Sequence, residues 1–143
     1  MIKARKIRGI KNGYRSGLEE TVAQQLHNNN IEFKYEDKEK KIEYTKPESK
    51  HKYTPDFPFD KVIIETKGLL SIDDRSKHLL IKEQHPELDI RFVFSNSKAK
   101  ISKGSKTTYA DWCNKHGFKF ADKLIPKEWL EEIKGNKKND WVN

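Results

Sequence analysis

The chain has 143 residues, of which 34% are hydrophobic, so it can bury about two-thirds of its unfolded surface as one domain. Its formal net charge of +8 favours a polyanion as the partner, and a ribosomal or structural role would be consistent with the same charge. No apolar run is long enough to span a membrane, and the basic start lacks the apolar core of a secretory signal. The single Cys113 excludes an internal disulfide, and because the five His residues are spread apart there is no Cys/His zinc spacing.

The first 15 residues carry six Lys and Arg side chains among glycines, which predicts a mobile basic arm that follows nucleic-acid phosphates. Its candidate phosphate-binding residues are Arg8, Lys11 and Arg15. We expect a single domain over residues 16–133 and a disordered tail over residues 134–143.

A helix is predicted after this arm, because Ser16 is a favoured N-cap residue and apolar side chains then recur at helical spacing as far as Leu26. Glu19 lies three residues after the cap and has two possible roles. In a capping box its carboxylate would bond the Ser16 amide, which is the commoner explanation. Alternatively, the carboxylate points into a functional site beside the apolar stripe.

Two further segments alternate apolar and polar side chains. Residues 31–36 and 42–44 each follow this pattern, which predicts strands with one solvated face. The run Lys38–Lys41 between them mixes both signs of charge and is typical of a solvated turn rather than of a binding patch.

A buried strand is predicted over residues 61–67, because a β-branched run follows the chain break at Pro58–Asp60. Side chains alternate along a strand, so Glu65 and Lys67 should emerge on one face with Ile63. Charge at the end of an otherwise apolar strand is the most informative feature of this segment.

Asp56 follows a proline and lies nine positions before Glu65. A hairpin between them would bring the two carboxylates together, with the Lys67 ammonium within reach. Two carboxylates can hold magnesium while leaving positions for a water and a phosphate oxygen, as hydrolysis of a phosphodiester requires. Lys67 would orient the attacking water or stabilise charge in the transition state. The E-x-K spacing alone is weak, because Glu and Lys two apart on a strand usually form a solvated face.

The second half of the chain alternates helices and strands. Ser71 opens a helix that continues to Gln84, a strand follows over residues 88–94, Thr108 caps a helix that ends at Gly117, and Pro126 begins a short helix. The helix after Ser71 carries four basic side chains that either face a polyanion or simply meet water. They are Arg75, Lys77, His78 and Lys82.

Six runs of residues resemble the bacteriophage endonuclease I type of Holliday-junction resolvase, within the P-D/E-x-K nuclease superfamily. Together they cover roughly residues 8–130, and so many runs in order are far more specific than a short motif. The runs are Arg15–Glu19, Tyr53–Phe57, Glu65–Leu69, Lys77–Ile81, Glu83–Arg91 and Lys119–Pro126.

By this resemblance, Glu19, Asp56, Glu65 and Lys67 are the catalytic residues, which favours the site role of Glu19 over the capping role. The same three acidic residues, with the backbone carbonyl of Thr66, are implied as ligands of Mg²⁺, for which Mn²⁺ would substitute. The basic side chains named above are the expected DNA-binding residues.

The resemblance also implies the fold and the partners. It implies an α/β fold, in which a mixed β-sheet flanked by helices forms a restriction-endonuclease-like core, and a domain-swapped homodimer that exchanges the first helix and the following strand. The implied substrate is branched DNA, chiefly four-way junctions, cut to leave 5′-phosphate ends in the cytoplasm of the host cell. Two alternatives remain: a nuclease that acts on linear or mismatched duplex, and a basic DNA-binding protein without catalysis.

Overall fold

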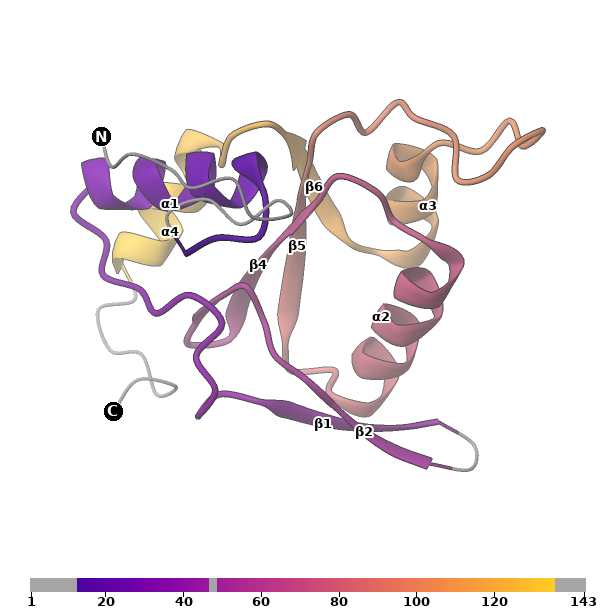
Figure 1. Cartoon of the computed structure of the whole chain (residues 1–143), viewed down its shortest axis with the longest axis horizontal. Coiled ribbons are helices and arrows are strands. Elements are labelled where there is room, and N and C mark those ends of the chain that lie inside the picture. Colours follow the sequence, from indigo (N-terminus) through magenta and orange to yellow (C-terminus); the bar gives the residue numbers. More distant parts are fainter. Residues whose placement is uncertain (1–12, 47–48, 136–143) are drawn as a thin grey trace.

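A four-stranded mixed sheet forms the centre of the protein in the computed structural model, which describes residues 13–46 and 49–135 (Figure 1). The strand order is β3 (Phe57–Phe59), β4 (Val62–Lys67), β5 (Asp89–Phe94) and β6 (Lys119–Asp122). β3 is antiparallel to β4, whereas β5 is parallel to both β4 and β6. The expected α/β class with a mixed sheet is therefore confirmed.

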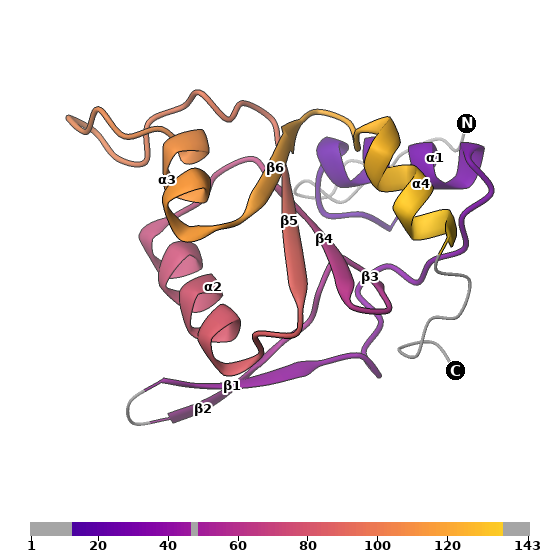
Figure 2. The same ribbon diagram turned by 180° about the vertical axis from the view of Figure 1, so that it is seen from behind.

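Helices cover both faces of this sheet, as the two opposite views show (Figures 1 and 2). α1 (Gly17–Asn28) and α4 (Lys127–Gly135) lie on one face, and α2 (Ile72–Gln84) and α3 (Tyr109–His116) lie on the other. The connections from β4 to β5 and from β5 to β6 run through α2 and α3, as parallel pairing requires.

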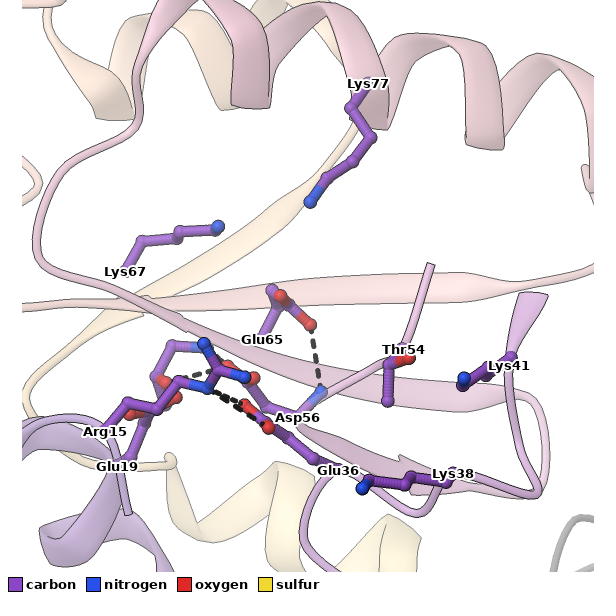
Figure 3. A pocket seen from close by; sticks show the side chains of 11 residues that line it. Arg15, Glu19, Glu36, Lys38, Lys41, Thr54, Asp56, Glu65, Lys67 and Lys77 are labelled. Carbon is purple, nitrogen blue, oxygen red and sulfur yellow. Dashed lines mark hydrogen bonds and ion pairs between the residues drawn. The ribbon is translucent and has the colours of Figure 1, made fainter. Parts of the chain in front are cut away.

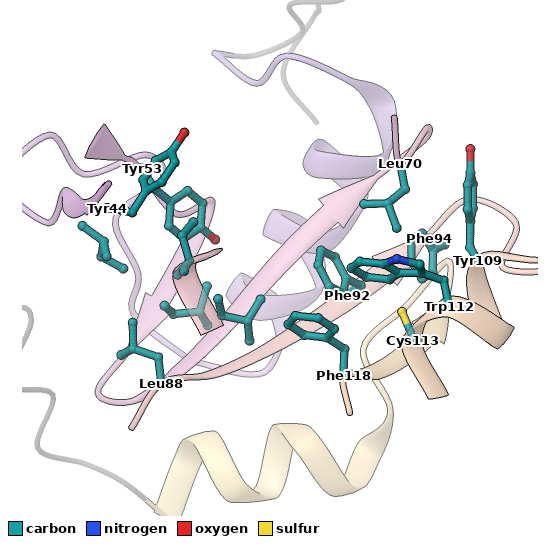
Figure 4. Close-up of a cluster of buried hydrophobic side chains, with 14 residues drawn as sticks. Tyr44, Tyr53, Leu70, Leu88, Phe92, Phe94, Tyr109, Trp112, Cys113 and Phe118 are labelled. Carbon is teal, nitrogen blue, oxygen red and sulfur yellow. The ribbon is translucent and has the colours of Figure 1, made fainter. Parts of the chain in front are cut away.

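Alternation along the central strands produces two separate cores. Ile63 and Phe92 face α2 and α3, whereas Ile64 and Val93 face α1 and α4. On the first face, the Phe92 ring is surrounded by aromatic rings, with its centroid 5.2 Å from that of Phe118 (Figure 4). The sheet thus forms a rigid base for the charged residues at the ends of its strands.

The predicted helix starts are confirmed. Ser71 and Thr108 each form a complete capping box with the acidic residue three positions later, and the Ser16 hydroxyl accepts a hydrogen bond from the Glu19 amide at 3.1 Å. Gly117 ends α3 in the left-handed conformation with φ of 78°. The capping residues and the glycine therefore begin and end these helices where the sequence predicted.

The strand predicted over residues 31–36 is wrong. This segment pairs with no strand in the part of the chain that the structure describes, and it ends in a turn in which Glu36 has a φ of 46°. Its alternation instead reflects packing: Ile31 is buried, and the rings of Phe33 and Tyr35 contact Phe57, with centroid distances of 5.3 and 5.5 Å. The predicted strand at residues 42–44 is confirmed as part of β1 (Ile42–Lys46), which pairs with β2 (Ser49–Tyr53).

Pro58 was interpreted as part of a chain break, yet it lies inside β3, opposite Ile63. A proline is tolerated there because β3 is the edge strand of the sheet, where a missing amide donor costs little. The turn is instead made at Asp60, whose φ is 41°. β2 and β6 were also missed, since both are short and carry few buried apolar side chains.

The ends of the chain are described only in part. α4 continues to Gly135, two residues beyond the expected domain boundary at residue 133, and the rest of the predicted tail lies outside the described residues, as do residues 1–12 of the predicted arm. None of the helices in the described ranges has the length and apolar character needed to cross a membrane.

Candidate active site

The β3–β4 hairpin brings Asp56 and Glu65 together as expected. The register pairs Phe57 with Ile64, so the residue before β3 lies beside the fourth residue of β4. The Asp56 amide donates a hydrogen bond to Oε1 of Glu65 at 3.2 Å. Both side chains are buried, with exposed fractions of 6% and 4%.

Glu19 reaches the same place from α1, and its two expected roles belong to different atoms. Its backbone amide bonds the Ser16 hydroxyl and so takes part in the helix cap, whereas Oε2 of its carboxylate accepts a hydrogen bond from the Tyr35 hydroxyl at 2.7 Å. The carboxylate is therefore free of the capping box and lies in the site.

These acidic residues line one cavity of about 410 Å³ (Figure 3). Figure 3 shows the ammonium groups of Lys67 and Lys77 on one side of Glu65, and Arg15, Glu19 and Glu36 on the other. The cavity is lined by acidic, basic and threonine side chains: Arg15, Glu19, Glu36, Lys38, Lys41, Thr54, Asp56, Glu65, Thr66, Lys67 and Lys77.

Each of the three predicted carboxylates has one oxygen held by protein donors. Oδ2 of Asp56 accepts from the amide and the hydroxyl of Thr66 at 3.0 and 2.9 Å. Oε1 of Glu65 accepts from the Tyr53 hydroxyl at 2.5 Å as well as from the Asp56 amide. The other oxygen of each group has no donor among the described residues, and Oε1 of Glu19 is fully buried without a partner.

This arrangement fits a hard divalent cation. Burial raises the pKa of Asp56 well above its usual value, and the charges of Glu65 and Glu19 raise it further. Burial also raises the pKa of Glu65, although Lys67 opposes the shift. Carboxylates that repel one another and keep unbonded oxygens are the ligands that Mg²⁺ and Mn²⁺ prefer.

The sequence interpretation missed Glu36. One oxygen each from Glu19, Glu36 and Asp56 lie within 4.8 Å of one another, so Glu36 can join a cation site. Arg15 lies beside it, with Nε 2.9 Å from a Glu36 oxygen. No local signal marked Glu36, because its place depends on the Glu36 amide bonding the Asp56 carbonyl at 3.1 Å.

The Lys38–Lys41 run is not only a solvated turn. The run forms an exposed turn, as expected, and its Lys38 and Lys41 side chains also line the cavity. Mixed charges along a short segment gave no indication of this role, because only the folded chain places the run beside Asp56.

The basic residues of α2 separate into different environments. Lys77 lines the cavity, whereas Arg75 donates to the Leu70 and Ile101 carbonyls and Lys82 donates to the Gly117 carbonyl. Contacts of Arg75 and Lys82 with DNA remain predictions. Those of Arg8 and Lys11 do too, since both lie outside the described residues.

The expectation that His78 contacts phosphate is corrected by the structure. Its side chain is 0% exposed and lies between the rings of Tyr53 and Phe92, at centroid distances of 5.2 and 5.0 Å. Burial lowers its pKa well below the usual value, and the nearby Lys77 and Lys67 lower it further. A neutral imidazole beneath the site cannot meet a phosphate.

Asp56→Asn is expected to raise the free energy of unfolding of the metal-free protein by about 1 kcal/mol. The Asp56 pKa is raised in the folded state, so its favourable contribution is complete below the unfolded pKa and is lost as pH rises through the folded pKa. The gain from the substitution should therefore grow with pH. Urea unfolding with a chelator present, on both sides of neutral pH, measures it; a less stable variant at every pH would contradict this account.

Comparison with known proteins gives two kinds of match. Residues 1–142 match the family described as phage endonuclease I. "Endonuclease I" of Escherichia phage T7 is 58% identical over 122 residues, which cover 85% of this chain and 80% of that protein. "Endodeoxyribonuclease 1" of Enterobacteria phage T3 is 57% identical over 122 residues, covering 85% of this chain and 79% of that protein.

Proposed function

This chain belongs to the phage endonuclease I family, and on that basis we propose that it is a magnesium-dependent, structure-selective endodeoxyribonuclease. Its substrate would be branched DNA, chiefly four-way junctions, cut by phosphodiester hydrolysis to leave 5′-phosphate ends. The observation that carries this proposal is the convergence of Glu19, Asp56, Glu65 and Lys67 on one cavity. Because both relatives are phage proteins, we place the activity in the cytoplasm of the host cell.

The acidic residues would hold the metal ion. Glu19, Asp56, Glu65 and the Thr66 carbonyl are the proposed ligands. Oxygens of Glu19, Asp56 and Glu36 lie within 4.8 Å of one another, so Glu36 can assist, whereas Glu65 lines the same cavity from β4. When bound, the ion neutralises phosphate charge and lowers the pKa of an attacking water. In each of the three carboxylates, one oxygen already accepts a hydrogen bond from a protein hydroxyl or amide. Little reorganisation is therefore needed for the other oxygen to bind the ion.

Lys67 would act on the reacting phosphate. Its ammonium lies 3.4 Å from Oδ1 of Asp74, a helix residue that also lies 4.0 Å from the Lys77 ammonium. Asp74 therefore restricts the positions of the Lys67 and Lys77 ammonium groups. Asp74 itself does not line the cavity. Lys67 held there can orient the attacking water or stabilise charge that develops on the phosphate oxygens.

The cavity rim would bind the DNA backbone. Lys38, Lys41, Lys77 and Arg15 all line the cavity, and the whole chain has a net charge of +8. Phosphate contacts position DNA without reading its sequence, so a rigid set of such contacts selects the angle between duplex arms. This supports selection by shape rather than by base sequence.

A homodimer with exchanged N-terminal elements would present two such sites. α1 is joined to β1 by residues 29–41, which contain neither helix nor strand, so α1 can pack on its own chain or on a partner with the same contacts. In either arrangement Glu19 completes a site whose Asp56, Glu65 and Lys67 follow β2. Two equivalent sites related by two-fold symmetry match the symmetry of a four-way junction.

The proposal is tested by incubating the protein with a synthetic four-way junction and a matched linear duplex, with magnesium or with calcium. We expect paired nicks in the junction with magnesium, little cutting of the duplex, and binding without cutting in calcium. Equal rates on the two substrates would indicate the alternative, a nuclease for linear or mismatched duplex. Cutting in a chelator would overturn the metal requirement.

A further inference from the structure

Two tyrosine hydroxyls donate hydrogen bonds to glutamates of the site, Tyr35 to Glu19 and Tyr53 to Glu65. We propose that Tyr53 and Tyr35 are positioning residues, which fix the oxygen that Glu65 and Glu19 present to a divalent cation and so set the affinity of the site for that cation. This inference rests on the proposed function in that it concerns the same metal site. It adds residues that neither the spacing of the acidic groups nor the family resemblance singled out for a role.

Tyr53 is held rigidly against Glu65. Its side chain is 2% exposed, and its hydroxyl lies 2.5 Å from Oε1 of Glu65. The Tyr53 hydroxyl donates to this oxygen, and the Asp56 amide supplies a second donor to it. With Oε1 held by two donors, Oε2 is the oxygen left for a cation.

The surroundings of Tyr53 explain why its ring cannot swing away. The His78 ring meets it edge to face at 5.2 Å, and the Lys77 ammonium lies 5.3 Å from its centroid on the cavity side. Neither nitrogen of His78 has a hydrogen-bond partner among the described residues. Burial of an imidazole without hydrogen-bond partners costs stability. We infer that His78 is placed there because its ring packs against Tyr53 and fixes it beneath the site.

Tyr35 plays the same part for Glu19. Its hydroxyl donates to Oε2 of Glu19 at 2.7 Å and accepts from the Arg15 amide at 3.4 Å. Its ring is packed between Tyr14 and Phe57, with centroid distances of 4.6 and 5.5 Å. The Tyr35 hydroxyl occupies Oε2, whereas Oε1 is buried and has no hydrogen-bond partner within residues 13–46 and 49–135.

Each tyrosine lies in the same half of the chain as the glutamate that it orients. Tyr35 and Glu19 both precede β1, whereas Tyr53 and Glu65 both follow it. Exchange of α1 together with the segment that follows it, as far as Tyr35, would leave both hydrogen bonds within one chain. The inference therefore holds for a monomer and for an exchanged dimer alike.

The test is direct binding of Mn²⁺ to the DNA-free protein, measured by calorimetry. Loss of a hydroxyl that orients a metal ligand typically weakens metal binding 10- to 100-fold, so Tyr53→Phe and Tyr35→Phe are each expected to raise the Kd for Mn²⁺ by about that factor. The matched control is Tyr44→Phe, because Tyr44 is also buried but stacks on His51, away from the cavity lining. That variant should bind Mn²⁺ as the wild type does.

A double-mutant cycle separates orientation from a general structural effect. In a Glu65→Ala background, Tyr53→Phe should cause no further loss of Mn²⁺ affinity, whereas in a Glu19→Ala background it should keep its full effect. Wild-type Kd values in both Tyr→Phe variants, or an equal effect of Tyr53→Phe in both backgrounds, would overturn the inference. If Tyr53→Phe folds poorly, the same cycle is carried out with Tyr35→Phe, because Tyr35 is only half-buried. Tyr35→Phe should then have no further effect on Mn²⁺ affinity in the Glu19→Ala background and its full effect in the Glu65→Ala background.

The same measurements distinguish failure of this inference from failure of the proposed function. Wild-type protein that binds Mn²⁺ but cuts no junction would contradict the proposed substrate and leave the tyrosine roles intact. Wild-type protein that cuts junctions while Tyr53→Phe and Tyr35→Phe bind Mn²⁺ normally would contradict only the tyrosine roles. Absence of Mn²⁺ binding by the wild type would overturn both.

Discussion

Glu65→Ala protein is expected to cut four-way junctions at least about a thousandfold more slowly than the wild type, which corresponds to about 4 kcal/mol of lost transition-state stabilisation. Glu65 combines complete burial, two protein donors on one oxygen and proximity to Lys67, so no other side chain can replace the oxygen that it presents. Binding of the junction should survive, because the basic residues of the rim are unchanged.

The measurement is a single-turnover rate with magnesium, together with a junction-binding titration in calcium. Glu32→Ala is the matched control, because Glu32 is exposed and lies outside the cavity lining. It should cut at the wild-type rate. A Glu65→Ala protein with near wild-type cutting would contradict the metal-ligand role, and one that loses binding and cutting together would show that Glu65 supports the fold instead.

A mixture of inactive Glu19→Ala and inactive Glu65→Ala chains, refolded together, is expected to regain nicking activity. In a dimer that exchanges α1, each heterodimer has one site with both glutamates intact and one site with neither. Random pairing makes about half of the dimers heterodimers, so about a quarter of the wild-type sites should recover. The recovered sites should nick one strand rather than make paired cuts.

Nicking of a labelled junction by the refolded mixture measures this recovery. Each parent refolded alone sets the background, and mixing the two parents without unfolding controls for exchange in the native state. No recovery above the parents would show that α1 completes the site of its own chain, because Glu19 and Glu65 are then both intact in no site.

Local chemistry made much of the fold predictable. The capping residues Ser71 and Thr108, the left-handed Gly117 and the β-branched run of β4 each favour one structure through contacts within a few residues. The pairing of Asp56 with Glu65 was predictable for the same reason, since a short hairpin leaves few ways to place two residues nine positions apart.

The segment from Ile31 to Glu36 shows where local pattern fails. Its alternation is real, but the apolar side chains pack against Phe57 and the α1 face of the sheet rather than within a strand pair. Alternation reports which side chains are buried, and it contains no information on whether a neighbouring strand is available. His78 illustrates the same limit, because its basic neighbours in sequence suggested that it is exposed like them, whereas the fold buries its side chain.

The sequence by itself determined the α/β class, the helix boundaries set by caps and the pairing of Asp56 with Glu65. Only the tertiary structure decided that Glu36, Lys38 and Lys41 join the site, that His78 lies beneath it, and that Tyr35 and Tyr53 each hold one carboxylate oxygen. Caps, turns and strand faces depend on interactions between residues close in sequence. The site depends on contacts between α1, the residues that follow it and the β3–β4 hairpin, which exist only once both cores have packed.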